Sequence, residues 1–293
     1  MQMKKFKKSD NAVVGIIAAF LIVGLIVAVL SIVQLQYVPE WMEEKEAAHM
    51  DEVANQFTQL KYALDIQSIV NDTTAISTSI KLGSEELPFF KTGRTFDSLS
   101  MVSDSCTILI NYNTIAATGA HLSKTYKTDA IKYSSSNYYF VNQNFIYEAG
   151  ALILSQGNEN VLIGRPPIIV SKPQDRKNIS MVFVNISGVE GKTSSSGYGT
   201  YDIYTQAVNS NMHYTKFYNV SNITIETDYV NAWNASFRRS FLQFGLPINY
   251  TVVTFPNKLV IYFHKDGIGK YYYDVYIREV NIKAEIGYGL SNS

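Results

Sequence analysis

The hydrophobic pattern of the chain is dominated by one uninterrupted apolar run, AVVGIIAAFLIVGLIVAVLSIV, at residues 12–33. A helix of this length is about 33 Å long, which is enough to cross a hydrocarbon layer about 30 Å thick. Four lysines precede the run within residues 4–8, and Tyr37 and Trp41 follow it. Basic residues favour the cytoplasmic side of a membrane and aromatic rings favour its interfaces. The pattern therefore predicts a membrane-spanning helix with the N-terminus inside and the rest of the chain outside.

A secretory signal peptide also begins with lysines and an apolar run. Its apolar part is usually about 7 to 15 residues long and ends in small residues at a cleavage site. Here the run is longer and ends in SIVQLQYVPEW, without an A-x-A pattern. We therefore expect the mature protein to keep the apolar helix.

A second, helical pattern covers residues 40–70. Apolar side chains recur there at alternating spacings of three and four, which places them in a stripe on one helical face. The stripe consists of Met50, Val53, Phe57, Leu60 and Leu64. Acidic residues 43, 44 and 46 suit the positive end of a helix that starts near Pro39, and the helix either continues the membrane segment or bends at this proline. The stripe packs on the outer domain of its own chain or on copies of itself, and the two interpretations are compatible.

From about residue 71 the pattern changes to short β-rich segments separated by Gly, Ser, Asn and Pro, which is typical of a sandwich or barrel. Residues 228–245 are an exception, because their apolar side chains recur every three or four positions and predict one helix. Between residues 271 and 286 the apolar positions change from odd to even numbers, which predicts a bulge or bend near Arg278 and Glu279. The predicted fold class is α+β: a long hydrophobic and then amphipathic N-terminal helix, followed by a β-rich, sandwich-like domain with one added helix.

Three regions follow from this pattern. Residues 1–9 form a basic leader, and residues 10–70 form the N-terminal helix. Within that helix, residues 12–36 are the membrane or filament-core segment and residues 40–70 are the amphipathic extension. Residues 71–293 form the extracellular β-rich domain.

Composition and charge agree with an exterior location. The 25 basic and 25 acidic residues cancel over the whole chain, but four of the lysines precede the apolar run, so the outer part is slightly acidic and unsuited to nucleic acid. Cys106 is the single cysteine, so no intrachain disulfide can form. Every N-glycosylation sequon follows the apolar run, which indicates a glycosylated exterior. The candidate residues are Asn71, Asn178, Asn185, Asn219, Asn222, Asn234 and Asn249.

Motifs for catalysis or cofactor binding are incomplete. The segment GVEGKT at residues 188–193 is similar to a phosphate-binding loop, but Ile186 stands where the first glycine is required. The four histidines lack metal-ligand spacing, and Cys106 has no nucleophile motif around it. We therefore predict a protein that is not an enzyme, with no catalytic, cofactor-binding or metal-binding residue. A membrane-anchored hydrolase that uses distant carboxylates or a metal is the less favoured alternative.

The order of lysines, apolar helix, amphipathic extension and β-rich domain resembles archaeal type IV pilin-like proteins, the superfamily of pilins and archaellins. The segment KKSDNAVVGIIAAFLIVG is similar to the class III signal peptide of that superfamily. The resemblance implies that a prepilin peptidase-like enzyme cuts before the apolar helix, between Ser9 and Asp10. It also implies that membrane assembly machinery packs the retained helices of many copies into a filament core. That core would run from Ala12 to about Leu64 and include Gly15, Gly24 and the apolar stripe.

The favoured function is thus a structural subunit: a pilin-like glycoprotein of an archaeal cell-surface filament. It would be inserted in the cytoplasmic membrane before assembly and would then form a helical polymer with copies of itself. The alternative is an uncleaved, single-pass, membrane-anchored surface glycoprotein for adhesion or envelope binding. The mass of the mature N-terminus distinguishes the two, because only a pilin loses the lysine leader.

Overall fold

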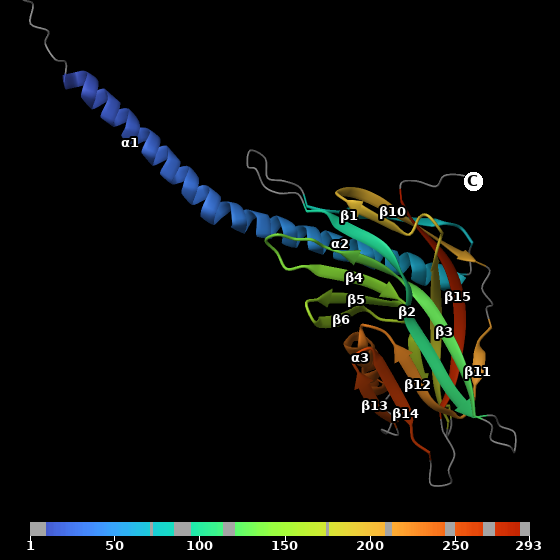
Figure 1. The fold of residues 1–293 in the computed structure, drawn as a ribbon. Helices are drawn as coiled ribbons and strands as arrows, with labels where there is room; N and C mark the ends of the chain where they lie inside the picture. Colours follow the sequence, from blue (N-terminus) through green and yellow to red (C-terminus); the bar gives the residue numbers. More distant parts are fainter. Residues whose placement is uncertain are drawn as a thin grey trace, which may run out of the picture.

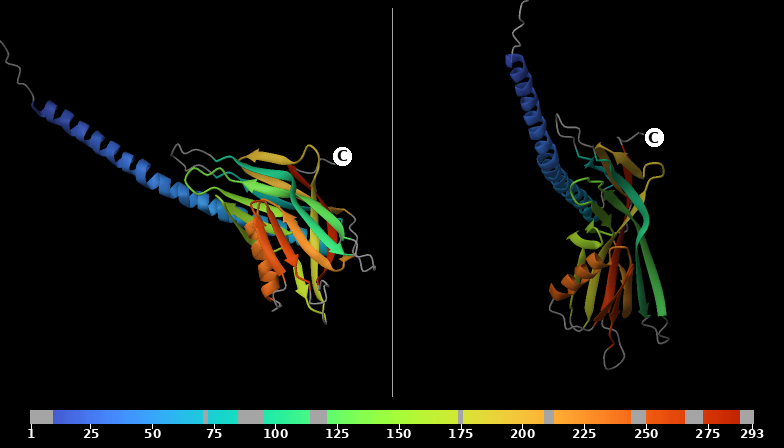
Figure 2. Two further views of the ribbon diagram at one scale, coloured as in Figure 1. Left: turned by 60° about the horizontal axis from the view of Figure 1, so that its bottom comes forward. Right: turned by 60° about the vertical axis from the view of Figure 1, so that its left-hand side comes forward.

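A computed structural model describes residues 10–70, 73–84, 95–113, 121–173, 176–208, 213–243, 250–265 and 273–287. Its first feature is one continuous rod built from α1 (Asp10–Ile32), a π-helical turn η1 (Val33–Tyr37) and α2 (Val38–Val70). Figures 1 and 2 show that α1 projects alone from the molecule, whereas α2 lies among the strands. The predicted long N-terminal helix is therefore confirmed.

Pro39 bends this rod without ending it. Proline has no N–H to donate, and its ring collides with the carbonyl four residues earlier, here that of Leu35. The π-helical turn resolves the conflict, because the Val38 N–H bonds to the Val33 carbonyl five residues back and widens the helix just before the proline. Figure 1 shows the helix axis changing direction between α1 and α2.

The described residues of the outer domain form two sheets. The first contains six strands, in the order β1 (Ile76–Leu82), β10 (Gly199–Val208), β15 (Tyr273–Gly287), β8 (Lys177–Gly188) and β7 (Ile168–Ser171), with β11 (Thr215–Phe217) also pairing with β15. The second contains nine, in the order β13 (Tyr250–Phe255), β14 (Lys258–Phe263), β12 (Val220–Glu226), β2 (Asp97–Asn113), β3 (His121–Ser134), β4 (Gln143–Glu148), β5 (Ala151–Gln156) and β6 (Glu159–Gly164), with β9 (Ser194–Gly197) on β2. The pair β8 and β15 is parallel, and the other strand pairs are antiparallel. With the helix that follows β12, this confirms the α+β class.

One hydrophobic core lies between the sheets and under the helix α3 (Val230–Gln243). The predicted helix within residues 228–245 is therefore present, and its repeating apolar residues face inward. Trp233, Phe237 and Phe241 are buried in this core together with Phe183 of β8 and Ile108 of β2.

A second core lies under α2. Phe57 of the helix stacks on Phe145 of β4 with ring centroids 5.8 Å apart, and it meets the ring of Tyr133 of β3 edge-on at 6.2 Å. Ile80 of β1 and Ile282 of β15 belong to the same cluster. The amphipathic half of the rod is thus an integral part of the outer domain's core.

Of the bulge or bend predicted near Arg278 and Glu279, the bulge is absent. The pairing of β15 with β8 runs from Tyr273 to Ala284 without a shift of register. The change in the apolar pattern is real, but it has another cause. Odd-numbered residues up to Ile277 pack in the core between the sheets, whereas even-numbered residues from Val280 onward pack in the core under α2. The strand passes between two cores that lie on its opposite faces.

Candidate functional site

The apolar helix α1 is the most unusual surface of the molecule. Its large hydrophobic side chains between Val14 and Ile32 are each 51% to 72% exposed. This helix is long and apolar enough to cross a membrane. Apart from the adjoining residues and the local helix backbone, no heavy atom lies within 4 Å of the position that a Cβ would take at Gly15 or Gly24, so the helix is open to a close neighbour at both glycines. A surface of this kind requires lipid or other apolar helices around it.

The residues predicted for leader cleavage and for the filament core fall into separate groups. Asp10 begins α1, and Ala12, Gly15 and Gly24 lie within it, whereas Ser9 lies outside the described residues. The apolar stripe of α2 is 0–1% exposed and is enclosed by the strands of its own domain; it comprises Met50, Val53, Phe57, Leu60 and Leu64. Of the two interpretations of the stripe, packing on the outer domain of its own chain is the one that the structure shows, and these five side chains are not available to a filament core. Among the large side chains predicted for the core, those from Val14 to Ile32 of α1 are the ones that the domain leaves exposed.

A buried carboxylate fixes the start of α2 to the domain. The side chain of Glu46 is fully buried and accepts hydrogen bonds from three successive backbone N–H groups in the turn between β3 and β4. Glu46 Oε1 lies 3.1 Å from the amide nitrogen of Tyr138, and Oε2 lies 2.7 Å and 2.6 Å from those of Tyr139 and Phe140. A charged acceptor strengthens each of these bonds. The turn is thereby held against the helix.

One helical turn later, His49 joins a second buried cluster. Its Nε2 lies 3.1 Å from Oδ2 of Asp97 at the start of β2, and the Tyr133 hydroxyl donates to the same oxygen. The Gly83 and Ser136 N–H groups also donate to Asp97, at 2.7 Å and 2.9 Å. Burial opposes ionisation of Asp97, but these four donors outweigh it and lower the pKa of the carboxyl below its usual value. The Asp97 carboxylate thus connects α2, β2, β3 and two loops.

The sequence interpretation missed the roles of Glu46 and His49. The sequence places Glu46 at the positive end of the helix, yet it is buried and binds another segment of the chain. The signal was present, because Met42, Glu46, Met50 and Val53 lie on one helical face. A charged residue within an apolar stripe must have a partner when it is buried.

The far end of α2 is also fixed. Gln67 Nε2 donates to the carbonyls of Thr74 and Thr205 at 3.3 Å and 2.7 Å, and Arg278 donates to the carbonyl of Ser68 at 2.7 Å. Polar contacts at both ends and an apolar stripe between them prevent α2 from sliding or rotating. Since α1 continues α2, the domain holds the apolar helix in one orientation.

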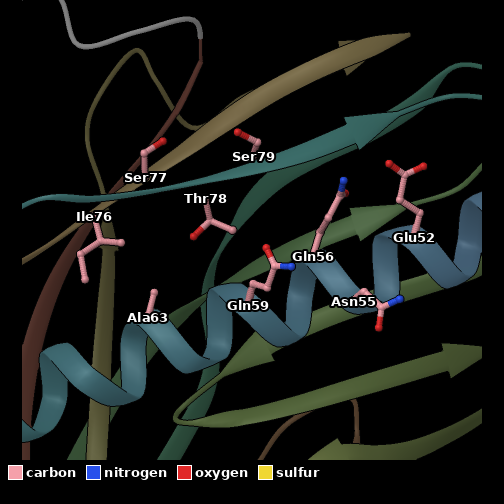
Figure 3. A pocket seen from close by; sticks show the side chains of 9 residues that line it. All are labelled: Glu52, Asn55, Gln56, Gln59, Ala63, Ile76, Ser77, Thr78 and Ser79. Carbon is pink, nitrogen blue, oxygen red and sulfur yellow. The ribbon is translucent and has the colours of Figure 1, made fainter.

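A polar groove of about 620 Å³ lies between α2 and the edge strand β1. Figure 3 shows Glu52, Asn55, Gln56 and Gln59 lining it from the helix, with residues 76–79 of β1 opposite. Gln56 Oε1 accepts the backbone N–H of Lys81 at 2.9 Å and so ties the edge strand to the helix. Glu52 is the sole titratable residue among those that line the groove.

Glu148 forms a third buried carboxylate cluster. Its oxygens accept hydrogen bonds from Trp233 Nε1, the Thr227 hydroxyl and the Ser105 hydroxyl, each at 2.7 Å. Burial raises the pKa of Glu148 in spite of these three donors. The cluster attaches α3 to the second sheet, and each carboxylate oxygen already has a donor.

The sequons occupy several parts of the outer domain. Asn178 and Asn185 lie in β8, Asn222 lies in β12 and Asn234 lies in α3, while Asn219 precedes β12; all five are partly exposed. Asn71 and Asn249 lie outside the described residues. In β12, Ile223, Thr224 and Ile225 are all buried and Glu226 is exposed, so burial does not alternate strictly along this strand. Glycosylation at these asparagines stays a prediction.

Comparison with known proteins gives one match. The model of a family of unknown function, DUF7289, matches residues 11–244, which include the rod and the outer domain as far as the end of α3. No curated protein and no solved structure matches the chain.

Proposed function

The chain belongs to the DUF7289 family, whose function is unknown, and we propose that this member is a pilin-like glycoprotein that forms a structural filament on the cell surface. One observation carries the proposal. An exposed helix that is uncharged from Ala12 onward continues without a linker into a helix whose apolar stripe is buried in the outer domain. The partners would be copies of the same chain, which surround α1 in the filament.

The exposed surface of α1 has a large energetic consequence. Covering a large aliphatic or aromatic side chain contributes about 1.5–3 kcal/mol relative to leaving it in water. Summed over α1, this amounts to tens of kcal/mol, so α1 cannot stay in water. Lipid supplies the cover before assembly, and neighbouring copies of α1 supply it after the helix leaves the membrane.

The rigid attachment of α1 favours a polymer over a simple anchor. A helical polymer repeats one interface, so every copy must present its domain at the same angle to the core helix. The Glu46 and Asp97 contacts at one end of α2 and the Gln67 contacts at the other supply such an orientation. A domain that is only tethered to a membrane needs no fixed angle and is served by a flexible linker.

Processing and location follow from the same proposal. A prepilin peptidase-like enzyme removes residues 1–9, and membrane assembly machinery then extracts the subunit into an extracellular filament. Before assembly the chain spans the cytoplasmic membrane with its N-terminus inside. In the filament, Ala12, Gly15 and Gly24 lie in the core, and the outer domain with its sequons faces the medium.

N-terminal mass spectrometry of sheared surface material and of the membrane fraction tests the proposal. We expect the surface form to begin at Asp10 and the membrane precursor to retain the lysines. Ser9→Glu blocks maturation, whereas the control Ser171→Glu, at an exposed position of β7, leaves it unchanged. If the chain keeps Lys4 to Lys8 and no surface material appears, the proposal is wrong and the protein is an uncleaved, anchored surface glycoprotein.

A further inference from the structure

A polar pocket of about 370 Å³ lies where three segments of the outer domain meet. These segments are the turn between β5 and β6, the start of α3 and the turn between β13 and β14. Sites for small ligands in proteins usually have volumes of about 300–1,000 Å³. The pocket is therefore large enough for one small ligand.

Hydrogen bonds hold the three segments in place. Asn160 of β6 lines the pocket, and its Oδ1 accepts the backbone N–H of Ala232 in the first turn of α3 at 2.9 Å. The backbone N–H of Thr227 donates to the carbonyl of Asn257, in the turn after β13, at 3.0 Å. The fold itself therefore fixes the walls of the pocket, and preorganisation of this kind reduces the cost of binding.

The buried carboxylate of Glu148 anchors the chain on both sides of Asp228. It accepts hydrogen bonds from the hydroxyl of Thr227, which precedes Asp228, and from the indole N–H of Trp233 in α3, each at 2.7 Å. The Thr227 hydroxyl oxygen in turn accepts the backbone N–H of Tyr229 at 3.1 Å. Asp228 itself is exposed and lines the pocket. Glu148 is thus a positioning residue for the pocket, because it fixes the neighbours of Asp228.

The side chains that line the pocket suit an uncharged ligand rich in hydroxyl groups. Asn158, Asn160 and Asn231 supply amides, each with donors and an acceptor, and Asp228 supplies a carboxylate acceptor. A sugar hydroxyl both donates and accepts, so amides and a carboxylate together match it. Phe255 is 47% exposed, and its ring offers an apolar face to the C–H groups of a pyranose.

Other classes of ligand match the lining less well. Asp228 is the one charged residue among those that line the pocket, so an anionic ligand would meet repulsion and no lining cation. Lys258 does not line the pocket, and its Nζ lies over the Phe255 ring, 5.3 Å from the ring centroid. An apolar ligand would leave the amides without hydrogen-bond partners. Among the described residues, no group of three or more acidic, histidine or cysteine side chains could hold a metal ion.

We propose that this pocket binds an uncharged sugar residue of a glycan and makes the outer domain adhesive. The amides and Asp228 hydrogen-bond to the sugar hydroxyls, and the ring of Phe255 packs on the C–H face of the sugar. Figure 1 shows α3, β13 and β14 well clear of α1, so a cover around α1 does not by itself close the pocket. The inference goes beyond the proposed function and does not depend on it, because the pocket is open in an anchored chain and in a filament alike.

Saturation-transfer NMR of the full chain in deuterated detergent micelles tests the pocket. The probes are the methyl glycosides of glucose, galactose, mannose and N-acetylglucosamine, and the methyl glycoside of glucuronic acid is the acidic comparison. Asn231→Ala and Phe255→Ala each remove one exposed side chain from the pocket and leave the cores intact. Tyr262→Ala, in β14, is the matched control, because its ring is 45% exposed and does not line the pocket.

We expect at least one neutral glycoside to receive saturation from the protein, and we expect each pocket variant to reduce this signal several-fold while Tyr262→Ala keeps it. The glucuronide should give a weaker signal than the glucoside, because Asp228 repels its carboxylate. The inference is overturned if no neutral glycoside gives a signal, if the glucuronide binds more strongly than the glucoside, or if the pocket variants and the control give equal signals. The N-terminal mass of the surface form tests the proposed function separately from each of these results.

Discussion

Replacing Glu46 with glutamine tests how firmly the apolar helix is attached to the domain. In the wild type, one oxygen accepts two backbone N–H groups, at 2.7 Å and 2.6 Å, and the other oxygen accepts a third at 3.1 Å. Glutamine keeps a single acceptor oxygen and turns an NH₂ group toward at least one of these donors. The substitution therefore removes the charge, breaks at least one hydrogen bond and places two donors face to face.

The expected size follows from the burial of this site. A hydrogen bond to a charged group contributes about 1.5–3 kcal/mol, and a buried donor left without a partner costs about 1–3 kcal/mol. Because Tyr138 is exposed, part of the turn can open to water and recover some of this loss. We expect Glu46→Gln to lower the free energy of unfolding by about 2–3 kcal/mol and Glu46→Ala, which removes all three bonds, by about 3–5 kcal/mol.

Urea unfolding of the full chain in detergent micelles, followed by circular dichroism, measures this loss. Glu43→Gln, at an exposed position one turn earlier on the same helix, is the matched control and should stay within about 0.5 kcal/mol of the wild type. Hydrogen exchange at the amides of residues 138–140 gives a local readout, and exchange should accelerate in Glu46→Gln alone. If Glu46→Gln unfolds like the control and these amides stay protected, the carboxylate does not hold the turn.

Other parts of the fold give independent predictions. Phe57→Ala should lower the free energy of unfolding by about 3–5 kcal/mol, because it leaves a cavity in the core under α2. The control Tyr62→Ala, at a side chain that is 69% exposed, should change this free energy little. Equal losses for the two variants in denaturant melts would contradict the prediction. The pKa of Asp97 is lowered in the folded state. The Asp97 carboxylate therefore contributes to the free energy of unfolding above its unfolded-state pKa of about 4, and this contribution is lost as the pH falls below that value. Asp97→Asn should reduce the loss of stability that the wild type shows on acidification. The pKa of Glu148 is raised in the folded state, so its ionisation lowers the free energy of unfolding as the pH rises through the folded-state pKa. Glu148→Gln keeps an acceptor for Trp233 and carries no charge at any pH. The stability of this variant relative to the wild type should therefore be higher at about pH 8 than at about pH 4.

The helices and the overall class could be predicted from periodicity alone. Residues 12–33 are uncharged, and α3 repeats Val230, Trp233, Phe237 and Phe241 on one face, so local spacing contains the information. The phase change in β15 was also visible, but its cause was not. Periodicity records which side chain is buried and not which core buries it, and a strand between two cores therefore gives the same pattern as a bulge.

The polar attachments of α2 could not be predicted. Glu46 binds a turn more than ninety residues later, and Asp97 gathers donors from residues 49, 83, 133 and 136. Such contacts depend on the order of strands in two sheets, which no local pattern specifies. The same limit explains why two interpretations of the stripe stayed open, because spacing alone cannot decide whether an apolar face meets its own domain or a copy.

The central claim is that the exposed apolar surface of α1 is covered by copies of itself in a surface filament. Electron cryomicroscopy of fibres sheared from cells, at a resolution that identifies side chains, tests it most directly. The account predicts a core of α1 helices that contains Gly15 and Gly24, with α2 buried in each outer domain as in the isolated chain. Surface fractions without such fibres, together with single chains that keep Lys4 to Lys8 in the membrane, would contradict it.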